Sequence, residues 1–540
     1  MTLATSWDTI VVGAGSAGAA AATTLARQRN GSVLLLEAGK PDNWHWFRIP
    51  IGVAHLLLGS RGLERYFTAP QRNLHGRRIF WPRGTGPGGS SRVNGMIWAR
   101  GDPAEYDRWA ADGLGGWAYA DLLPGFQAIE RYGAAHSRTR GREGPVPIAT
   151  YSPLDPLTEG FLRACQSMGW PMLDDYNDGG YEGAGLLQLN TQRGLRVSTN
   201  EAFLEPARSL ANFALVCDAL VTRITLEGRR ATGVTCMQDG RRIDFTARRE
   251  VVLCAGAIRS PQLLELSGIG DAARLRRLGI AVAHHVPAVG EGLADHLHVR
   301  VNLRARGAQT VNDLQRSLRV KLAQGLRFAL RRDGFLSTAT CTAHALVRSA
   351  VEDPQPDVKL QLHLVTSPDA RDPARYVLDP FPGFSIAVFQ LRPHARGSVH
   401  IDNPDPHRHP VIEPNYLGDP RDAATTLRGL RLARRLAAQP ALSRYVDSEI
   451  RPGPTADSDE ALLDHARATG TTSYHPVGTC RMGPPGAAVV DARLRVHGIE
   501  ALRVADASIM PSLPSSNTNA PAIMIGHKAA TLIGEHGPGA

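Results

Sequence analysis

The 540-residue chain predicts an α/β fold (α+β overall), with a Rossmann-like nucleotide-binding domain and a second, mainly antiparallel-sheet domain. Near the N-terminus, an apolar run leads through a glycine-rich turn and an alanine-rich run into a second apolar run. Further along, "PGFSIAVFQLRPHARGSVHIDN", residues 382–403, alternates β-rich runs with turn residues, which predicts antiparallel strands. The chain is also too long for one small core, so we expect two lobes.

The N-terminal segment predicts the first half of a Rossmann domain. Residues 8–12 form a short apolar run that favours a strand, and the alanine-rich residues 17–27 favour a helix. The following run "SVLLLE", residues 32–37, is apolar up to its final acid and predicts a buried parallel strand. Strand, turn, helix, strand and acid together indicate a dinucleotide site far more strongly than a glycine pattern alone.

The glycines of this segment have separate roles. Gly13, Gly15 and Gly18 fit the pattern G-x-G-x-x-G. The first glycine permits the sharp turn, the second lets the backbone approach a pyrophosphate, and the third lets helix and strand pack closely. Free N–H groups at the helix N-terminus then face the phosphate charge. Glu37 lies where an acid accepts ribose hydroxyls, and its charge disfavours a 2′-phosphate, but the motif does not separate NAD from FAD.

The charge pattern argues against nucleic-acid binding. The chain has 61 Lys and Arg against 51 Asp and Glu, a formal net charge of +10. The arginines are scattered singly or in pairs, as in Arg77-Arg78, and no dense basic run with interleaved aromatic residues occurs. An anionic cofactor, or a general attraction to acidic surfaces, is the better explanation of the excess.

Cysteine spacing and hydropathy argue against a metal-binding protein and against a membrane-spanning one. The six cysteines include no C-x-x-C pair, so we predict no metal site and reduced thiols. No run of about 18 apolar residues occurs, so no membrane span is expected. The N-terminus "MTLATSWDTIVVGAG" has no charged segment followed by an apolar one, and we therefore predict a cytoplasmic protein.

The second lobe contains an expected helix and an expected loop. The segment "DAATTLRGLRLARRLAAQPAL", residues 422–442, has leucines at helical spacing and predicts an amphipathic helix. The segment "NPDPHRHP", residues 403–410, holds two histidines, but its Pro, Asn and Asp residues favour a loop between strands over a metal site.

A histidine near the C-terminus allows three interpretations. "SYHPVGTCRMG", residues 473–483, places His475 five residues before Cys480. A metal site needs several convergent ligands, and only Cys480 is near in sequence. A single histidine is ordinarily a packed residue, whereas an imidazole with a pKa near 6.5 also suits proton abstraction near pH 7.

Three long segments resemble one family of flavoenzymes. They are "GGSSRVNGMIWARGDPAEYDRW" (88–109), "GAIRSPQLLELSGIG" (256–270) and the stretch from "YHPVGTCRMG" to "NAPAIMIGHKAA" (474–530). In order and in sequence they resemble the glucose-methanol-choline (GMC) oxidoreductase family, over essentially the whole chain. The resemblance implies FAD as cofactor and oxidation of a CH–OH donor. It places an FAD-binding domain at 5–100, 190–300 and 470–540, and a substrate-binding cap domain at 101–189 and 301–469.

The resemblance also implies a set of site residues. His475 would abstract the hydroxyl proton of a primary alcohol while hydride passes to flavin N5, and Asn519 would be the second hydrogen-bonding residue at the substrate oxygen. The segment 94–97 would run along the isoalloxazine, Val221 would meet the adenine, and Asp506 and Ala507 would contact the ribityl and phosphate region. The predicted cofactor-binding residues are Gly13, Ala14, Gly15, Ser16, Ala17, Gly18, Glu37, Ala38, Asn94, Gly95, Met96, Ile97, Val221, Asp506 and Ala507.

Two departures from the family pattern bear on how FAD is attached and on which substrate is used. Val93 stands near a histidine that attaches FAD covalently in some relatives, so we predict non-covalent FAD. Thr342 stands where choline enzymes carry a glutamate, which disfavours choline dehydrogenase activity without removing it as an alternative. A second alternative is a lyase that acts on cyanohydrins. The residues do not decide whether O₂ or a quinone- or dye-type acceptor re-oxidises the flavin.

Overall fold

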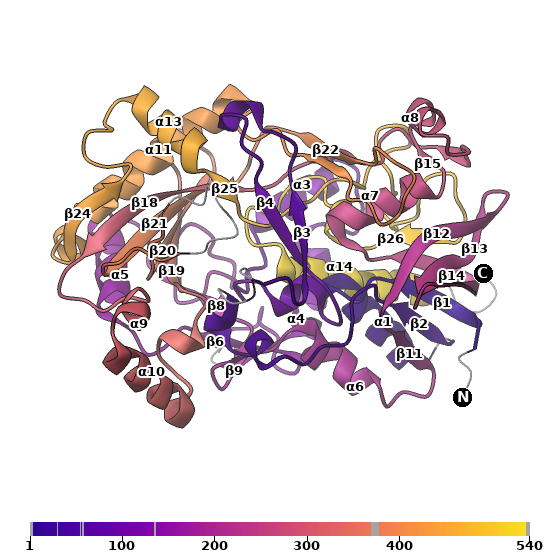
Figure 1. The fold of residues 1–540 in the computed structure, drawn as a ribbon, viewed down its shortest axis with the longest axis horizontal. Coiled ribbons are helices and arrows are strands. Elements are labelled where there is room, and N and C mark those ends of the chain that lie inside the picture. Colours follow the sequence, from indigo (N-terminus) through magenta and orange to yellow (C-terminus); the bar gives the residue numbers. More distant parts are fainter. Residues whose placement is uncertain are drawn as a thin grey trace.

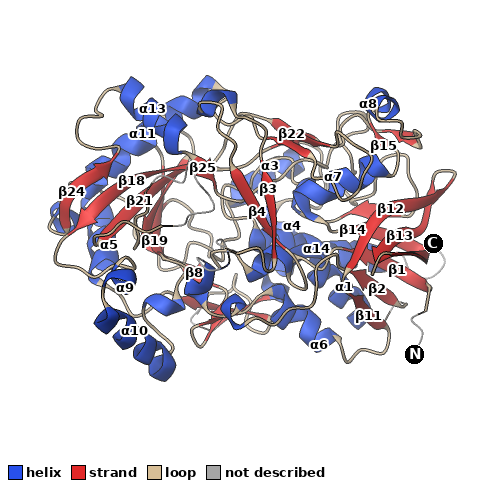
Figure 2. Ribbon diagram, in the orientation of Figure 1, coloured by secondary structure: helices blue, strands red, loops and turns tan. Residues whose placement is uncertain are grey.

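In the computed structural model the described residues are 4–29, 31–53, 56, 59–133, 137–368 and 377–535. Two seven-stranded sheets lie at opposite ends of the molecule (Figures 1 and 2). The hairpin of β3 (Leu63–Phe67) and β4 (Phe80–Gly84) lies between them. Both predicted lobes are therefore present, and the predicted fold class is confirmed.

The first sheet has the strand order β11-β2-β1-β14-β13-β12, and β26 pairs with β14. Its members are β1 (Ser6–Val12), β2 (Val33–Leu36), β11 (Phe213–Val216), β12 (Ala219–Glu227), β13 (Arg230–Gln238), β14 (Arg241–Leu253) and β26 (Leu502–Val504). The pairs of β1 with β2 and β14, of β2 with β11, and of β14 with β26 are parallel, whereas β12, β13 and β14 form an antiparallel meander. All four residues of β2 are buried, as expected for a parallel strand covered on both faces.

Two helices from opposite ends of the sequence pack together beside this sheet. They are α1 (Ser16–Gln28) and α14 (Asn519–Gly534). A Cβ on Gly526 would lie 2.0 Å from the carbonyl oxygen of Ala17, so the two helices approach closely only because residue 526 is glycine. The C-terminal residues thus complete the N-terminal fold.

The second sheet is antiparallel throughout, with the strand order β24-β18-β21-β20-β19-β7, and β25 pairs with β18. Its members are β7 (Gly183–Leu186), β18 (Leu297–Ala305), β19 (Cys341–Val347), β20 (Val358–His363), β21 (Gly383–Gln390), β24 (Val446–Arg451) and β25 (Thr471–Thr472). One face packs with α5 (Pro156–Ser167) and α11 (Pro420–Ala437) in a second hydrophobic core. The side chains of the other face alternate with that core along each strand.

Parts of the second lobe differ from expectation. Of the strands expected in 382–403, β21 joins the large sheet, but β22 (Gly397–His400) forms a separate sheet with β17 (Glu291–Leu293) and β23 (Val411–Glu413). The helix expected at 422–442 is α11, which ends at Ala437. Residue 440 is a proline, which has no N–H for α11 and instead starts α12 (Pro440–Ser443).

The glycine-rich stretch 80–110 begins and ends in regular elements. Its first residues form β4, and its last form α3 (Pro103–Ala111). With α4 (Tyr119–Ile129), α3 shares the core of the first sheet through buried aromatic residues such as Trp109 and Phe126. The predicted division places both helices in the cap, so the exact domain boundaries stay a prediction.

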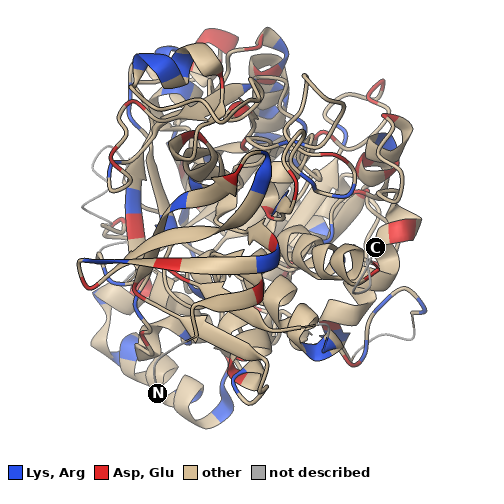
Figure 3. Ribbon diagram, turned by 90° about the vertical axis from the view of Figure 1, so that its right-hand side faces the viewer, with Lys and Arg blue, Asp and Glu red and all other residues tan. Residues whose placement is uncertain are grey.

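The remaining elements are shorter or peripheral. They are β5 (Glu130–Tyr132), β6 (Val146–Thr150), β8 (Gln188–Leu189), β9 (Thr191–Gln192), β10 (Leu195–Arg196), β15 (Ile269–Gly270), β16 (His284–His285), α6 (Glu205–Ala207), α7 (Gly256–Leu266), α8 (Ala272–Arg277), α9 (Asp313–Arg316), α10 (Leu318–Arg331) and α13 (Asp459–Thr469). Among the described residues, no helix combines the length and apolar character needed to cross a membrane. Basic and acidic segments are interspersed over the face shown in Figure 3.

Candidate active site

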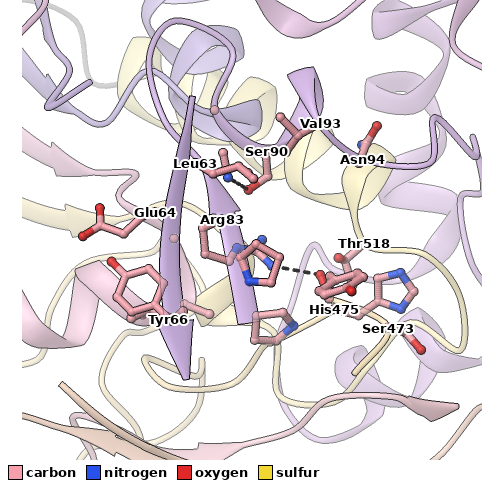
Figure 4. A pocket seen from close by; sticks show the side chains of 18 of the residues that line it. Leu63, Glu64, Tyr66, Arg83, Ser90, Val93, Asn94, Ser473, His475 and Thr518 are labelled. Carbon is pink, nitrogen blue, oxygen red and sulfur yellow. Dashed lines mark hydrogen bonds between the residues drawn. The ribbon is translucent and has the colours of Figure 1, made fainter. Parts of the chain in front are cut away.

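A cavity of about 570 Å³ is bounded by residues of both sheets and of the β3–β4 hairpin. One end is formed by the turn between β1 and α1, and the other by the polar face of the antiparallel sheet. Figure 4 shows Ser473, His475 and Thr518 grouped together, with Val93 and Asn94 above them in the view. Residues far apart in sequence therefore meet around one space.

The three glycines of the β1–α1 turn have the geometry that nucleotide binding requires. Gly13 has φ +101°, and a Cβ there would lie 2.6 Å from the carbonyl oxygen of Cys254. A Cβ on Gly18 would lie 1.8 Å from the carbonyl oxygen of Gly13, so no larger residue fits. A Cβ on Gly15 would meet no atom within 4 Å, because this residue faces the cavity. The space above Gly15 is where a pyrophosphate would approach.

Glu37 organises the loops around this turn. Its carboxylate accepts hydrogen bonds from the backbone N–H groups of Ala14 (2.8 Å), Gly39 (2.8 Å) and Gly86 (3.0 Å). The side chain also lines the cavity, and a carboxylate has about four acceptor sites, so one remains for a ribose hydroxyl. The sequence predicted the ribose contact but missed this structural role.

Thirteen of the fifteen predicted cofactor residues line the cavity. Ala14 and Gly18 do not; they lie behind it, in contact with Glu37 and Gly13. Neither α1 nor α14 has a side-chain cap at its N-terminus, so free N–H groups are directed at this end of the cavity. The residues that line it are Gly13, Gly15, Ser16, Ala17, Glu37, Ala38, Asn94, Gly95, Met96, Ile97, Val221, Asp506 and Ala507.

His475 is buried in the opposite wall, and its backbone is held firmly. Its N–H donates to Oδ1 of Asp295 at 2.7 Å, and the same carboxylate accepts from the hydroxyls of Thr472 (2.5 Å) and Tyr416. The preceding residue, Tyr474, has φ +64°, a conformation rare for an aromatic residue. This turn directs the imidazole into the cavity.

The hydrogen bonds of His296 determine which nitrogen of His475 carries the proton. Nε2 of His296 lies 2.9 Å from the carbonyl oxygen of Leu391, which only accepts, so this nitrogen carries hydrogen. Burial lowers the pKa of His296 to about 4, so the ring is neutral and its Nδ1 is an acceptor. Nδ1 of His475 lies 3.0 Å from it and must donate. Nε2 of His475 therefore carries no hydrogen and is an acceptor.

The hydrogen bonds of Asn517 and Lys359 agree with this tautomer of His475. Nζ of Lys359 donates to Oδ1 of Asn517 at 3.0 Å, which fixes the orientation of the amide. Nδ2 of Asn517 then lies 3.0 Å from Nε2 of His475 and donates to it. A hydroxyl that replaces this hydrogen bond would meet an acceptor on His475 and a donor on Asn517.

Two models of GMC oxidoreductases match the chain, at residues 7–298 and 393–526. The chain belongs to the GMC oxidoreductase family. It is therefore an FAD-dependent oxidoreductase that acts on CH–OH groups, as the sequence predicted.

Individual relatives within the GMC family match over nearly the full chain. Mitochondrial choline dehydrogenase of Mus musculus is 38% identical over 98% of this chain and 89% of its own length. An alcohol dehydrogenase [acceptor] of Pseudomonas putida is 35% identical over 98% of this chain and 95% of its own. The crystal structure of pyridoxine 4-oxidase from Mesorbium loti is 29% identical, has a TM-score of 0.88, and covers 98% of this chain and 99% of its own.

In this GMC oxidoreductase the predicted role of Asn519 does not agree with its contacts. Oδ1 of Asn519 accepts from the hydroxyl of Ser16 at 2.7 Å, and its Nδ2 is buried without a partner among the described residues. Asn519 is the first residue of α14, so its side chain points toward the β1–α1 turn. The residue at His475 is Asn517, two positions earlier. The unpartnered amide at the phosphate end fits a bound FAD.

The environment keeps His475 neutral. Burial, followed by the charges of His296, Lys359 and Arg83, lowers its pKa well below the usual 6.5. Cys480 does not share this site, because it is buried in the core of the first sheet. Among the residues that the structure describes, no cluster of three His, Cys, Asp or Glu side chains can hold a metal ion.

Proposed function

We propose that this GMC oxidoreductase oxidises a primary alcohol to an aldehyde, with Nε2 of His475 as the acceptor of the hydroxyl proton. The observation that carries the proposal is the tautomer of His475, which is neutral, protonated at Nδ1 and unprotonated on the cavity side. A base of this kind typically contributes about 10²- to 10⁴-fold to the rate.

The residues of the chain have separable tasks in the reaction. FAD supplies flavin N5 as the acceptor of the hydride that leaves the carbinol carbon. Asn517 donates a hydrogen bond to the substrate oxygen and holds it beside Nε2 of His475. His475 takes the hydroxyl proton, and His296 accepts a hydrogen bond from the resulting imidazolium. The uncapped N-terminus of α14 favours negative charge at its end of the cavity.

Choline oxidation is the second candidate, because the relatives named above include a choline dehydrogenase of high coverage. The position of Thr342 weakens it. The hydroxyl of Thr342 bonds that of Thr158 at 2.7 Å, in the core side of the antiparallel sheet rather than in the cavity. The carboxylates that line the cavity among the described residues are Glu37, Glu64 and Asp506, and none of them belongs to that sheet. A quaternary ammonium would lack a counter-charge there.

Anaerobic reduction tests the proposed function. A primary alcohol should bleach the flavin absorption of the wild-type protein, and His475→Gln should keep its flavin but bleach about 10²-fold or more slowly. His409→Gln is the matched control, because His409 is exposed and does not line the cavity. A cyanohydrin lyase would show no bleaching with any alcohol, and unchanged bleaching in His475→Gln would remove the base from the proposal.

A further inference from the structure

Arg300 lies on the polar face of the antiparallel sheet. On β18, His298, Arg300 and Asn302 line the cavity, whereas the alternate residues Val299 and Val301 lie in the hydrophobic core. Arg300 thus lines the end of the cavity that the antiparallel sheet forms, opposite the β1–α1 turn.

Arg300 lacks the partners that its neighbours have. Nδ1 of His298 lies 3.2 Å from the hydroxyl of Ser473, and Nε2 of Gln361 lies 3.1 Å from Nε2 of His363. The guanidinium of Arg300 makes no hydrogen bond or ion pair with a described residue, and its Nε is buried. An unpaired charge in such a position is costly unless a ligand completes it.

The charged residues around Arg300 do not supply a counter-charge for its guanidinium. Arg451 also lines the cavity but is paired with Asp379 at 2.5 Å, and Lys359 donates to Asn517. Glu64 is held by Arg259 at 2.6 Å and by His409 at 2.8 Å. Asp379 and Glu64 therefore have other partners, and Arg300 forms no ion pair with a described carboxylate.

The geometry points to a substrate that carries a carboxylate at the end remote from its hydroxyl, with Arg300 as the binding group for that carboxylate. This inference rests on the proposed function and names its substrate class. The planar guanidinium presents donors in a fork that matches a carboxylate. His298 bonds Ser473, close to His475, and Arg300 lies about 7 Å further along the strand, so a compact molecule reaches both.

A matched pair of alcohols tests the class. We expect the wild-type enzyme to prefer 4-(hydroxymethyl)benzoate over benzyl alcohol by roughly tenfold or more in kcat/KM. Arg300→Gln should abolish this preference through KM, because it should lower kcat/KM for 4-(hydroxymethyl)benzoate roughly tenfold or more relative to benzyl alcohol. Arg304→Gln is the control, because Arg304 lies on the same strand but is exposed and paired with Asp447.

Two further measurements separate the outcomes. Benzoate should perturb the flavin absorption of the wild-type enzyme and bind roughly tenfold or more weakly to Arg300→Gln. Equal use of the two alcohols, a preference for choline, or unchanged benzoate binding in Arg300→Gln would overturn the assignment. Failure to oxidise any alcohol, with benzoate binding as expected, would instead refute the proposed function and leave the anion site standing.

A second surface, on helix α10, supports an independent inference. Leu318, Leu322, Leu326 and Leu330 recur every four residues and are each between 62% and 75% exposed. With 3.6 residues per turn, this spacing places all four on one side of the helix. Only Phe328 of α10 is buried, so the helix is attached by its other side and stands at the edge of the molecule (Figure 1).

The charges around the leucines indicate what covers them. Arg319, Lys321, Arg331 and Arg332 are exposed on the same helix or at its end, and none is in an ion pair with a described carboxylate. Arg327 is paired with Asp333 at 2.5 Å. A second copy of the chain would bring the same cations against one another, whereas an anionic surface would neutralise them.

We propose that α10 lies in the surface of a bilayer that contains anionic lipids, with its leucines among the acyl chains. An exposed apolar face bordered by basic residues is the composition of interfacial helices. Basic residues near such a surface add to the affinity in a salt-dependent way.

Vesicle sedimentation of the full-length holoenzyme tests this surface. The protein should sediment with vesicles of equal parts phosphatidylcholine and phosphatidylglycerol, and much less with phosphatidylcholine alone or at high salt. The double variant Leu322→Ser/Leu326→Ser should bind about tenfold or more weakly while its turnover is unchanged. Val351→Ser, at a position 86% exposed elsewhere on the surface, should bind as wild type. Absence of lipid binding, or a dimer dissociated by the double variant, would overturn the proposal.

Discussion

Nδ1 of His475 lies 3.0 Å from Nδ1 of His296, and the other nitrogen of His296 is bound to the carbonyl oxygen of Leu391. The second histidine thereby selects the tautomer of the first. The proton acceptor thus owes its reactive form to a residue 179 positions away in sequence.

Replacement of His296 should reduce turnover without loss of flavin. His296→Leu removes the acceptor for Nδ1 of His475, so the reactive tautomer loses its support, and we expect kcat to fall about 10²-fold. His296→Gln keeps an acceptor oxygen and should recover part of the loss. Stopped-flow measurement of flavin bleaching checks both variants, and equal rates in His296→Leu and wild type would contradict the assignment.

The two asparagines at the start of α14 should have different effects. Asn517→Ala removes the donor to the substrate oxygen and should lower kcat about 10-fold to 10²-fold with flavin retained. Asn519→Ala removes the partner of Ser16 and should weaken FAD binding with a smaller effect on kcat of the loaded enzyme. Flavin content and kcat are measured on both. The reverse pattern would restore the role first predicted for Asn519.

The two glycines of the phosphate turn form a second matched pair. Gly15→Ala places a methyl group in open space, so the protein should fold but bind FAD poorly. Gly18→Ala drives a Cβ against the carbonyl of Gly13 and should destabilise the protein by about 1–3 kcal/mol or more. Visible absorption reports the flavin and thermal unfolding reports stability. A yellow, wild-type-like Gly15→Ala protein would argue against the phosphate site.

The flavin should be released by denaturation. Val93 lines the cavity near the position where some relatives attach FAD through histidine, and valine has no nucleophilic atom. Precipitation with acid should leave all yellow colour in the supernatant. Colour in the protein pellet would show a covalent bond, and mass spectrometry of its peptides would then locate the attachment.

Acidification should destabilise the protein below pH 6.5. Burial lowers the pKa of His475 well below 6.5 and that of His296 to about 4, so between those values the unfolded chain binds protons that the folded chain does not. This part of the stability is complete above pH 6.5 and is lost as the pH falls.

The titration of Asp295 has the opposite effect on stability to that of the two histidines. Burial raises the pKa of Asp295 to about 6, so its protonation favours the folded state as the pH falls below that value. One carboxyl acts against two histidines, and we expect a net decrease of the melting temperature of the holoenzyme between pH 6.5 and 4. The decrease should be smaller in His296→Leu. A melting temperature independent of pH in this range would show that the histidines are not held neutral.

Contiguous motifs carried most of what the sequence could predict. Gly13, Gly15, Gly18 and Glu37 fall within 25 residues, so their pattern already specifies a local shape. His475 was placed by a family resemblance and lines the cavity together with Gly13, Gly15 and Glu37.

The partners of His475 could not be predicted in the same way. His296, Lys359 and Asn517 come from three separate segments, and no local pattern marks them as neighbours. The segment "SSNTNAP" offers two asparagines, and only the start of α14 decides that Asn519 turns toward Ser16 while Asn517 turns toward His475. The sequence therefore indicated two candidate asparagines but not which of their side chains points toward His475.

The pairing of β26 with β14 and of α14 with α1 has a consequence for biosynthesis. An emerging polypeptide exposes β1 and α1 early, yet their apolar surfaces stay incompletely covered until residues 502–534 have left the ribosome. We expect nascent chains that stop short of residue 500 to require chaperone protection and to be degraded rather than accumulate as partial flavoproteins.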